Sequence, residues 1–582
     1  MEKLAGLALF AAIEPHLLRS IAAEFDWFSL PGGQLLFRQG DKDDSLYVVL
    51  SGRLGAFLPN DEGKEVLIRQ MPTGETVGEM AVLSGEPRSA TVLALRDTEL
   101  VRLSKPAFDQ LIEQHPKSLR FITDLLVHRL REPPRLAAWT AAPKTVAIFP
   151  FSRELAASGF ARSLAKAFEE LGFRASVLDH TSLERPIEWF NAVEEAHDIV
   201  LYEADAEESE WTRHCLRQAD RVVLLAEATR PPSFVPPAIE AALNNPRRAL
   251  IELVLYRDQS VSPQTISILK LFEVTQHHHV RRQVPRDFRR LARMLTGRAI
   301  GVVLGGGGAR ALTHIGVIRA LRESGMELDL FGGVSMGSII AAGAALEWDD
   351  QVLGERMRDA FSGANPVGDY TVPMIALARG KKATALFRRH FGEALIEDCP
   401  CTYFCVSANL TKGQLKVHRT GPIWWATRAS TAIPGLLPPV IEGSDILVDG
   451  GVLNNLPVDF MSEMRRGPII AVDASNDYGF KATIDDLDHR PLWQLVNHAR
   501  KGTPNIVRVL MAAGALGSHT QMKLLRRNVD LLLEPPLAEV SMLDWKAFDF
   551  TVEAGYRHTM EMLEKKKGVL VPKEIRPLPP AG

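Results

Sequence analysis

The sharpest change in the pattern of apolar and polar positions lies in the second half of the chain. An apolar run from Ile300 to Leu304 gives way to four glycines, after which apolar residues recur at helical spacing. A second apolar run ends in the glycine-rich turn at residues 333–337, and small residues follow at once. Apolar runs followed by helical periodicity predict two consecutive strand–turn–helix units.

The pattern divides the rest of the chain into further domains. Residues 1–132 alternate short β-rich runs with glycine turns, which predicts a small β-rich domain that ends in a helix. Residues 144–290 alternate strands and helices, as in a parallel α/β domain, and carry no glycine-rich phosphate loop. Residues 298–550 form a second α/β domain, and residues 551–582 are expected to be a helix and a loose tail.

Composition narrows the classes of protein that fit this pattern. The 582 residues carry 68 basic and 71 acidic side chains, which gives a net charge of −3. The chain therefore has no overall positive charge that would attract it to nucleic acid. It opens without a signal peptide and has no apolar run of about 18 residues, so a cytoplasmic protein is expected. Cys399, Cys401 and Cys405 fall in a predicted buried strand without a second zinc-spaced pair, so no metal site is expected.

The two glycine-rich turns are the candidate sites of chemistry. Glycines 305–308 leave backbone N–H groups bare at a helix N-terminus, which suits an anion. The second turn reads G-x-S-x-G, a strand-to-helix turn that lifts Ser335 above a sheet as a candidate nucleophile. The first turn alone also fits a dinucleotide fingerprint, with Asp329 as the ribose ligand. A serine at the end of the strand that carries Asp329 weighs against that alternative.

A third element supplies an acid. The run ILVDGG is an apolar strand that ends in Asp449, and the two glycines after it allow a sharp turn that leaves the carboxylate exposed. Asp449 lies 114 residues after Ser335 (449 − 335), an order that open α/β hydrolytic sheets allow. Taken alone, D-G-G would more often be an Asx-type turn.

Together, GGGGAR, GVSMG and DGG, with RASTAIPGLLPP before the last and NNLP after it, resemble the patatin-like phospholipases, and most closely the bacterial relatives of neuropathy target esterase. The resemblance implies a Ser-Asp dyad without histidine and without a catalytic cofactor, in which Ser335 is the nucleophile and Asp449 its base. It also implies an oxyanion hole made by the amides of Gly306, Gly307 and Gly308. The chain departs from the family at Ala311, where glycine is usual.

The N-terminal domain contains a second candidate site, at residues 78–91. A short helix there would aim N–H groups at a phosphate. The block resembles a cyclic nucleotide-binding β-roll, in which Glu79 would hold the ribose 2′-hydroxyl while Arg88, Ser89 and the amides near Gly78 and Ala81 would hold the cyclic phosphate. Serine at position 89 favours cAMP over cGMP, and a β-roll that binds no nucleotide is the alternative. The proline-bounded link after residue 132 argues against a following DNA-binding helix-turn-helix.

Two basic segments are candidates for contact with lipid. The three histidines 277–279 and the arginine-rich run to Arg298 are expected to join the middle and catalytic domains. The apolar helical face in this run (Phe288, Leu291, Ala292 and Leu295) is expected over a domain seam, with a grip on anionic headgroups as the alternative. Residues 348–391 are expected to be helical and basic near their end, as in a lid or lipid-facing segment.

The sequence therefore predicts a multidomain α/β protein with an N-terminal β-roll, a parallel α/β middle domain and a patatin-like hydrolase domain. Its expected function is hydrolysis of acyl esters of phospholipids or lysophospholipids, with cAMP or cGMP as a regulatory ligand and peripheral contact with membranes. Two alternatives stay open. One is a catalytically inactive nucleotide-sensing scaffold, and the other is a lipase or transacylase that acts on neutral lipids.

Overall fold

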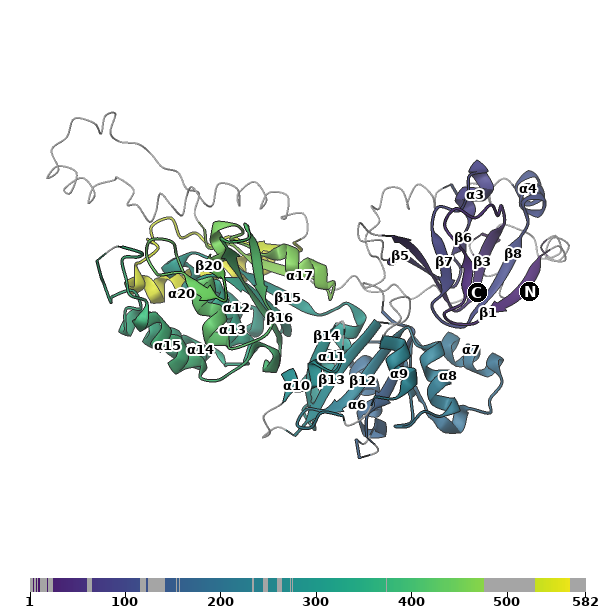
Figure 1. The fold of residues 1–582 in the computed structure, drawn as a ribbon, viewed down its shortest axis with the longest axis horizontal. Helices are drawn as coiled ribbons and strands as arrows, with labels where there is room; N and C mark the ends of the chain where they lie inside the picture. Colours follow the sequence, from purple (N-terminus) through teal and green to yellow (C-terminus); the bar gives the residue numbers. More distant parts are fainter. Residues whose placement is uncertain are drawn as a thin grey trace. The chain divides into compact units, whose positions relative to one another are not determined.

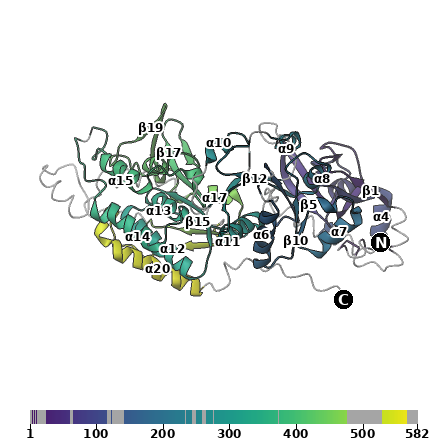
Figure 2. The same cartoon turned by 90° about the horizontal axis from the view of Figure 1, so that it is seen from below.

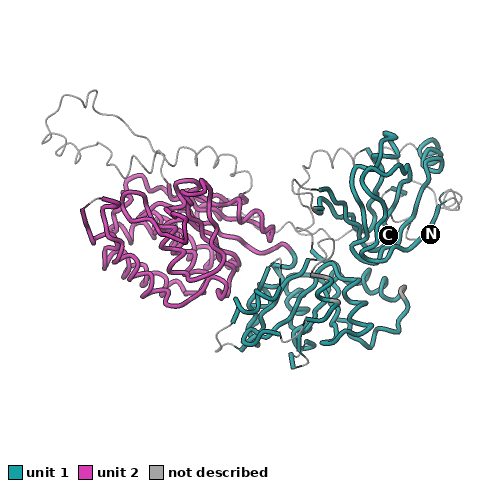
Figure 3. The backbone as a smooth tube through the Cα atoms, viewed as in Figure 1, with its two compact units in different colours: residues 1–296 teal, residues 297–582 magenta. Residues whose placement is uncertain are grey.

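A computed structural model covers the whole chain. It describes a few isolated positions before residue 25 and residues 25–59, 65–115, 122–123, 142–475 and 529–565, except for 153, 156, 233–234, 244–249, 259–263, 273, 275 and 373. Most of the expected linker (residues 132–141) and the expected C-terminal tail beyond 565 lie outside the described residues. The chain separates into two compact units, residues 1–296 and 297–582, which Figure 3 colours differently. Each unit is described by itself.

Two four-stranded antiparallel sheets form the first part of unit 1 (Figure 1). Their strand orders are β1-β8-β3-β6 and β2-β7-β4-β5, and apolar residues of both sheets share one core, as the predicted β-roll requires. The predicted short helix is α3 (Glu79–Ser84), and α4 (Lys105–Gln114) begins the expected helical stretch. The strands are β1 (Asp26–Leu30), β2 (Leu35–Phe37), β3 (Leu46–Ser51), β4 (Arg53–Pro59), β5 (Glu65–Pro72), β6 (Thr76–Val77), β7 (Thr91–Ala94) and β8 (Thr98–Leu103).

The second part of unit 1 is a six-stranded parallel sheet in the order β10-β11-β9-β12-β13-β14. Two helices share a core cluster with one face of the sheet, and four with the other. The strands are β9 (Thr145–Pro150), β10 (Ala175–Leu178), β11 (Ile199–Glu203), β12 (Arg221–Glu227), β13 (Leu250–Arg257) and β14 (Gln276–Arg281). The first face is covered by α6 (Ala157–Glu170) and α11 (Pro285–Thr296), and the second by α7 (Ile187–Ala196), α8 (Glu210–Gln218), α9 (Pro237–Leu243) and α10 (Thr265–Leu269).

The segment expected to join the middle and catalytic domains belongs to this sheet. Histidines 277–279 lie within β14, the last strand, and α11 packs on α6, with the rings of Phe160 and Phe288 5.4 Å apart. Phe288, Leu291, Ala292 and Leu295 are all buried in the core. The apolar face of α11 is therefore covered by the core of the middle domain and does not provide the alternative grip on lipid headgroups.

Unit 2 is built on an eight-stranded mixed sheet in the order β19-β20-β17-β16-β15-β21-β22, with β18 paired to β17. Strands β17, β16, β15, β21 and β22 run parallel, whereas β20 pairs antiparallel with β17. Both strands predicted before the glycine turns form, as does the predicted strand before Asp449. The strands are β15 (Ile300–Leu304), β16 (Leu328–Val334), β17 (Thr402–Asn409), β18 (Gln414–His418), β19 (Val440–Glu442), β20 (Asp445–Asp449), β21 (Ile469–Val472) and β22 (Leu531–Leu533).

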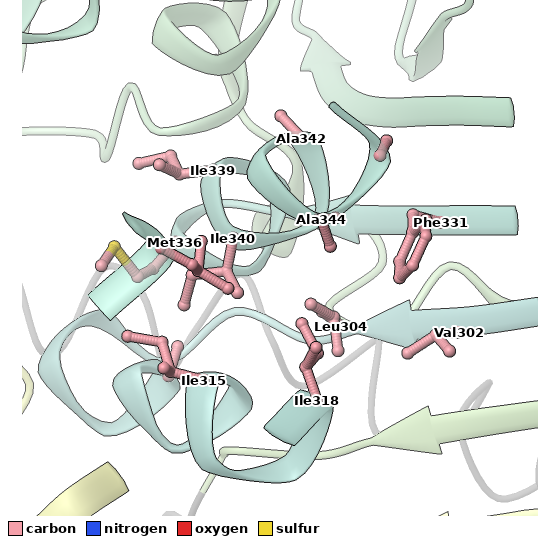
Figure 4. Packing of buried hydrophobic residues seen from close by; sticks show 14 of the residues in the cluster. Val302, Leu304, Ile315, Ile318, Phe331, Met336, Ile339, Ile340, Ala342 and Ala344 are labelled. Carbon is pink, nitrogen blue, oxygen red and sulfur yellow. The ribbon is translucent and has the colours of Figure 1, made fainter. Parts of the chain in front are cut away.

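Helices α12 (Thr313–Glu323) and α13 (Met336–Ala345) follow the two glycine turns and pack on β15 and β16. Figure 4 shows Leu304, Ile318 and Ile340 among the buried side chains of one cluster. Helix α20 (Phe548–Lys565) lies along α12 (Figure 2), and the expected domain boundary at residue 550 falls inside it. A Cβ on Gly316 would lie 1.9 Å from the carbonyl oxygen of Val552, so the two helices meet backbone to backbone.

The stretch expected to be helical from 348 to 391 is broken in its middle. Helix α14 (Asp350–Met357) continues as one π-helical turn (Arg358–Gly363), and α15 (Lys381–Phe391) begins only after a long irregular segment. Asn365 takes a positive φ of 43° and Pro366 has no N–H to donate, which together end the helix. Among the described helices, none is both long enough and apolar enough to cross a bilayer.

Candidate active site

Ser335 lies at a sharp turn between β16 and α13. It is the residue before α13 and has a positive φ of 53°, a strained conformation for a residue with a side chain. The turn is possible because two neighbours are glycines. A Cβ on Gly333 would lie 2.7 Å from the carbonyl carbon of Gly337, and one on Gly337 would lie 2.2 Å from the carbonyl oxygen of Leu304. The tight packing fixes the position of the hydroxyl.

Asp449, at the end of β20, meets this serine. Its Oδ2 accepts a hydrogen bond of 2.6 Å from Ser335 Oγ, and its Oδ1 accepts one of 2.8 Å from the N–H of Gly451. The carboxyl group is fully buried, and this burial raises its pKa from 3.8 to about 6, against the hydrogen bonds from Ser335 and Gly451, which lower it. The geometry provides a carboxylate beside a serine hydroxyl.

The glycine loop forms one wall of a pocket above Ser335. The lining residues are Gly306, Gly307, Gly308, Arg310, Ser335, Ile433, Asn455, Ser475 and Met542. Gly306 donates its N–H to the carbonyl of Asn455 at 3.3 Å, whereas the amides of Gly307 and Gly308 donate to no acceptor within the described part of the chain. These two amides are therefore the ones that remain for an oxyanion.

Ala311 does not line this pocket. It is fully buried in the 3-10 turn Gly308–Leu312, and its methyl group packs in the core cluster of unit 2. The departure from the usual glycine therefore adds a methyl group to the core and leaves the described pocket wall unchanged.

The site contains residues to which sequence reasoning assigned no role. Ser430 Oγ accepts the N–H of Ser335 at 2.9 Å and donates to the carbonyl of Val406 at 2.7 Å, which holds the strained turn. Asn455 donates from Nδ2 to the carbonyl of Gly306 at 3.3 Å. Both residues lie in the RASTAIPGLLPP and NNLP stretches, but their partners are distant in sequence, so only the fold brings them together.

No histidine among the described residues hydrogen-bonds to Asp449 or Ser335. The Nε2–H of His314 donates to the carbonyl of Gly305 at 2.8 Å, and burial lowers the pKa of His314 to about 4, so this imidazole is neutral. His418 instead shares a hydrogen bond of 2.8 Å with Ser407, on the strand next to Asp449. The described contacts are those of a serine and an aspartate alone.

The dinucleotide alternative is not supported by the position of its acidic residue. Asp329 lies at the beginning of β16, whereas the serine turn follows the other end of that strand. Its carboxylate is buried and accepts the N–H of Ile300 at 3.1 Å. It therefore lies far along the strand from the glycine loop that it would have to complete.

In the β-roll, the residues expected at a cyclic phosphate lie around α3. Arg88 is buried, and its Nη2 donates to Asp43 at 2.5 Å and to the carbonyl of Ser45 at 2.7 Å. Burial alone would raise the pKa of Asp43, but its hydrogen bonds, chiefly from Arg88, hold it at about 2. Glu79 is buried and Ser89 is exposed. Asp43 is therefore a built-in anionic partner of Arg88, which the sequence did not reveal.

Comparison with known proteins gives three family matches. Residues 302–461 match the patatin-like phospholipase family, residues 27–115 the cyclic nucleotide-binding domain, and residues 142–285 the P-loop-like domain of the neuropathy target esterase family. An uncharacterized NTE family protein of Mycobacterium tuberculosis is 31% identical over 570 residues, which cover 95% of this chain and 94% of the relative. The chain belongs to the neuropathy target esterase (NTE) family.

Longer animal proteins are also relatives of this NTE family chain. The human patatin-like phospholipase domain-containing protein 6 is 31% identical over 621 residues, which cover 94% of this chain but 45% of the human protein. The chain thus spans about half the length of these relatives. Among solved structures, the catabolite activator protein of Thermus thermophilus is 28% identical and covers 28% of this chain and 71% of its own, with a TM-score of 0.20.

Proposed function

We propose that this NTE family chain is a serine esterase that hydrolyses acyl esters of phospholipids or lysophospholipids. The observation that carries the proposal is the hydrogen bond of 2.6 Å between Ser335 Oγ and the buried carboxylate of Asp449. It lies beside a loop whose amides at Gly307 and Gly308 have no acceptor in the described chain. The nucleophile and the oxyanion donors then line one pocket, and the buried base is hydrogen-bonded to the nucleophile.

The reaction follows from this arrangement. Asp449 takes the proton of Ser335 as Oγ attacks the ester carbonyl, and the oxyanion is bound by the amides of Gly307 and Gly308. The protonated Asp449 then gives its proton to the leaving alcohol, which leaves an acyl group on Ser335. Water then attacks this acyl group while Asp449 accepts a proton from it. As the bond between the acyl carbon and Oγ breaks, Asp449 returns this proton to Ser335 Oγ, so the fatty acid is released and both side chains are restored. A pKa near 6 makes the carboxylate a stronger base that is still ionised at neutral pH.

The lining of the pocket supports a phospholipid substrate. Ile433 and Met542 offer apolar contact to an acyl chain, while Arg310 is the single charged residue among the described lining residues. An arginine among the lining residues suits a phosphate-bearing headgroup better than a neutral glyceride. The neutral-lipid alternative is tested by offering triacylglycerol beside lysophosphatidylcholine.

We propose further that a cyclic nucleotide regulates the enzyme through the β-roll, with Gly78, Glu79, Ala81, Arg88 and Ser89 at the ligand. Because Arg88 is bound to Asp43 in this structure, the cyclic phosphate has to replace Asp43 or share Arg88 with it. Calorimetric titration with cAMP and cGMP, on the unsubstituted protein and on Arg88→Gln, tests the site. If both proteins bind the cyclic nucleotide with equal affinity, Arg88 does not belong to the nucleotide site.

The decisive experiment compares fatty-acid release from lysophosphatidylcholine by the unsubstituted protein, Ser335→Ala and Asp449→Ala, with and without cAMP. Release that both substitutions abolish in folded protein supports the dyad. In parallel, a fluorophosphonate probe should label the unsubstituted protein at Ser335. Absence of both release and labelling would favour the inactive nucleotide-sensing scaffold.

A further inference from the structure

The irregular segment between the π-helical turn and α15 exposes an unusual set of apolar side chains. Tyr370, Val372, Met374 and Ile375, here called the apolar tip, are 68%, 74%, 86% and 74% exposed. No other large apolar side chain in the described residues exceeds 60%. Single exposed apolar residues are ordinary, but four within six positions mark an interaction surface.

The apolar tip is carried by a hydrogen-bonded base. Thr371 donates its N–H to the carbonyl of Leu377 at 2.9 Å, and Arg379 donates to the carbonyl of Asp369 at 2.9 Å. Tyr370 and Ala378 pair across this base as an isolated antiparallel bridge. The backbone around the exposed side chains is thus fixed on both sides, and their exposure is a feature of the fold.

The same base is joined to the wall of the active-site pocket. Leu377 and Ala378 donate their N–H groups to the carbonyls of Gly435 and Leu436, at 2.9 and 3.0 Å. Their side chains pack in a small cluster with Ile433, which lines the pocket above Ser335. The base that carries the apolar tip is therefore packed against the wall of the active-site pocket.

Positive charge follows the apolar tip directly. Arg379, Lys381 and Lys382 are exposed at the start of α15. The carboxylate of Asp369 accepts the backbone N–H of Lys382 at 3.1 Å and lies at the base of the segment. An apolar projection with cations beside it is complementary to a phospholipid surface, where acyl chains lie beneath anionic headgroups.

We propose that the apolar tip, with Arg379, Lys381 and Lys382, docks the catalytic unit on an anionic phospholipid surface. This inference rests on the proposed function, because docking there places the pocket wall of Ile433 against the layer that holds the ester. The occupant is the interfacial region of a bilayer. Burial of apolar side chains supplies binding to any phospholipid surface, and the cations add a preference for anionic lipid.

The test is co-sedimentation of the full chain with vesicles of phosphatidylcholine, alone or mixed with phosphatidylglycerol, in a Ser335→Ala background that leaves the lipid intact. Val372→Ser with Ile375→Ser should weaken binding to both vesicles about tenfold or more. Lys381→Gln with Lys382→Gln should remove about 30-fold of affinity for the anionic vesicles only, since each cation contributes about 1 kcal/mol.

The matched control is Ile266→Ser with Leu271→Ser, two exposed apolar residues at α10 in unit 1, which should leave binding unchanged. Thermal unfolding of each variant confirms that it folds. The docking proposal is wrong if the variant with Val372→Ser and Ile375→Ser binds vesicles as tightly as its parent. It is also wrong if the control variant loses as much vesicle affinity as that variant. Binding that depends on the apolar tip, in a protein whose unsubstituted form releases no fatty acid, would overturn the proposed function and leave the docking surface intact.

Discussion

Replacing Asp449 by asparagine is expected to stabilise the catalytic unit at neutral pH and to abolish hydrolysis at the same time. Burial raises the pKa of this carboxyl group from 3.8 to about 6, so folding at pH 8 places a charge where the neutral acid is favoured. A shift of about 2 pKa units corresponds to about 3 kcal/mol of unfolding free energy. Removing the charge with asparagine should therefore raise the unfolding free energy of the catalytic unit by this amount.

Asparagine is nearly isosteric with aspartate and keeps both contacts. Its oxygen can accept the N–H of Gly451, and its amide can donate to Ser335 Oγ. Between pH 3.8 and 6, the folded protein binds a proton that the unfolded chain has lost, so the contribution of Asp449 to stability falls as the pH rises. The advantage of Asp449→Asn should therefore be small below pH 4, grow up to about pH 6 and stay constant above it.

The buried cysteines provide an assay specific to this unit. Cys399, Cys401 and Cys405 lie in the catalytic unit, and all are buried. In a Cys215→Ala background, their reaction with 4,4′-dithiodipyridine in increasing urea reports unfolding of that unit alone. A gain of about 3 kcal/mol should move the midpoint by about 1 M urea at pH 8.

Asp445→Asn is the matched control, because Asp445 lies on the same strand but is hydrogen-bonded to Lys412, which lowers its pKa. Its replacement should bring no gain at any pH. A midpoint for Asp449→Asn that is unchanged or lower at pH 8, or that is displaced equally at pH 5 and pH 8, would refute the reasoning from burial.

Three further outcomes follow from the same geometry. If Asp449 is the base, kcat/KM for a short-chain ester should fall about tenfold per pH unit below pH 6 and level off above it, and a profile that is flat down to pH 4.5 would exclude this role. Gly308→Ala should lower the rate of hydrolysis by about 100-fold, because the new Cβ would lie 2.3 Å from the carbonyl oxygen of Met542. Gly325→Ala is the control: Gly325 also has a positive φ but lies in open space, so this variant should keep full activity. Ser430→Ala leaves the N–H of Ser335 without its acceptor and should reduce kcat about tenfold with little change in KM; unchanged kcat would show that the turn holds without it.

Glycine placement made the two turns at the candidate site predictable from sequence. Where a glycine stands because a side chain would collide, as at Gly333 and Gly337, the local sequence contains most of the information about the turn. The strand before the first turn could be predicted in the same way, because Ile300–Leu304 contains no polar side chain. The fold class and the family resemblance could therefore be inferred from the sequence alone.

What sequence could not supply were contacts between distant segments and departures from periodicity. Ser430 meets Ser335 from 95 residues away, and no local pattern marks its hydroxyl as an acceptor. The pairing of Arg88 with Asp43 depends in the same way on the closure of the β-roll. The helix predicted through residues 364–380 does not form, because Pro366 and the positive φ of Asn365 interrupt it.

The bond between Ala309 and Met542 has a consequence for biosynthesis. The N–H of Ala309, at the end of the glycine loop, donates to the carbonyl of Met542 at 2.7 Å. These residues are 233 positions apart (542 − 309), so at about 5–20 residues per second the ribosome needs roughly 12–47 s to deliver the second after the first. Until then the loop lacks this support, and a nascent chain already holding Ser335 and Asp449 should not yet hydrolyse lipid.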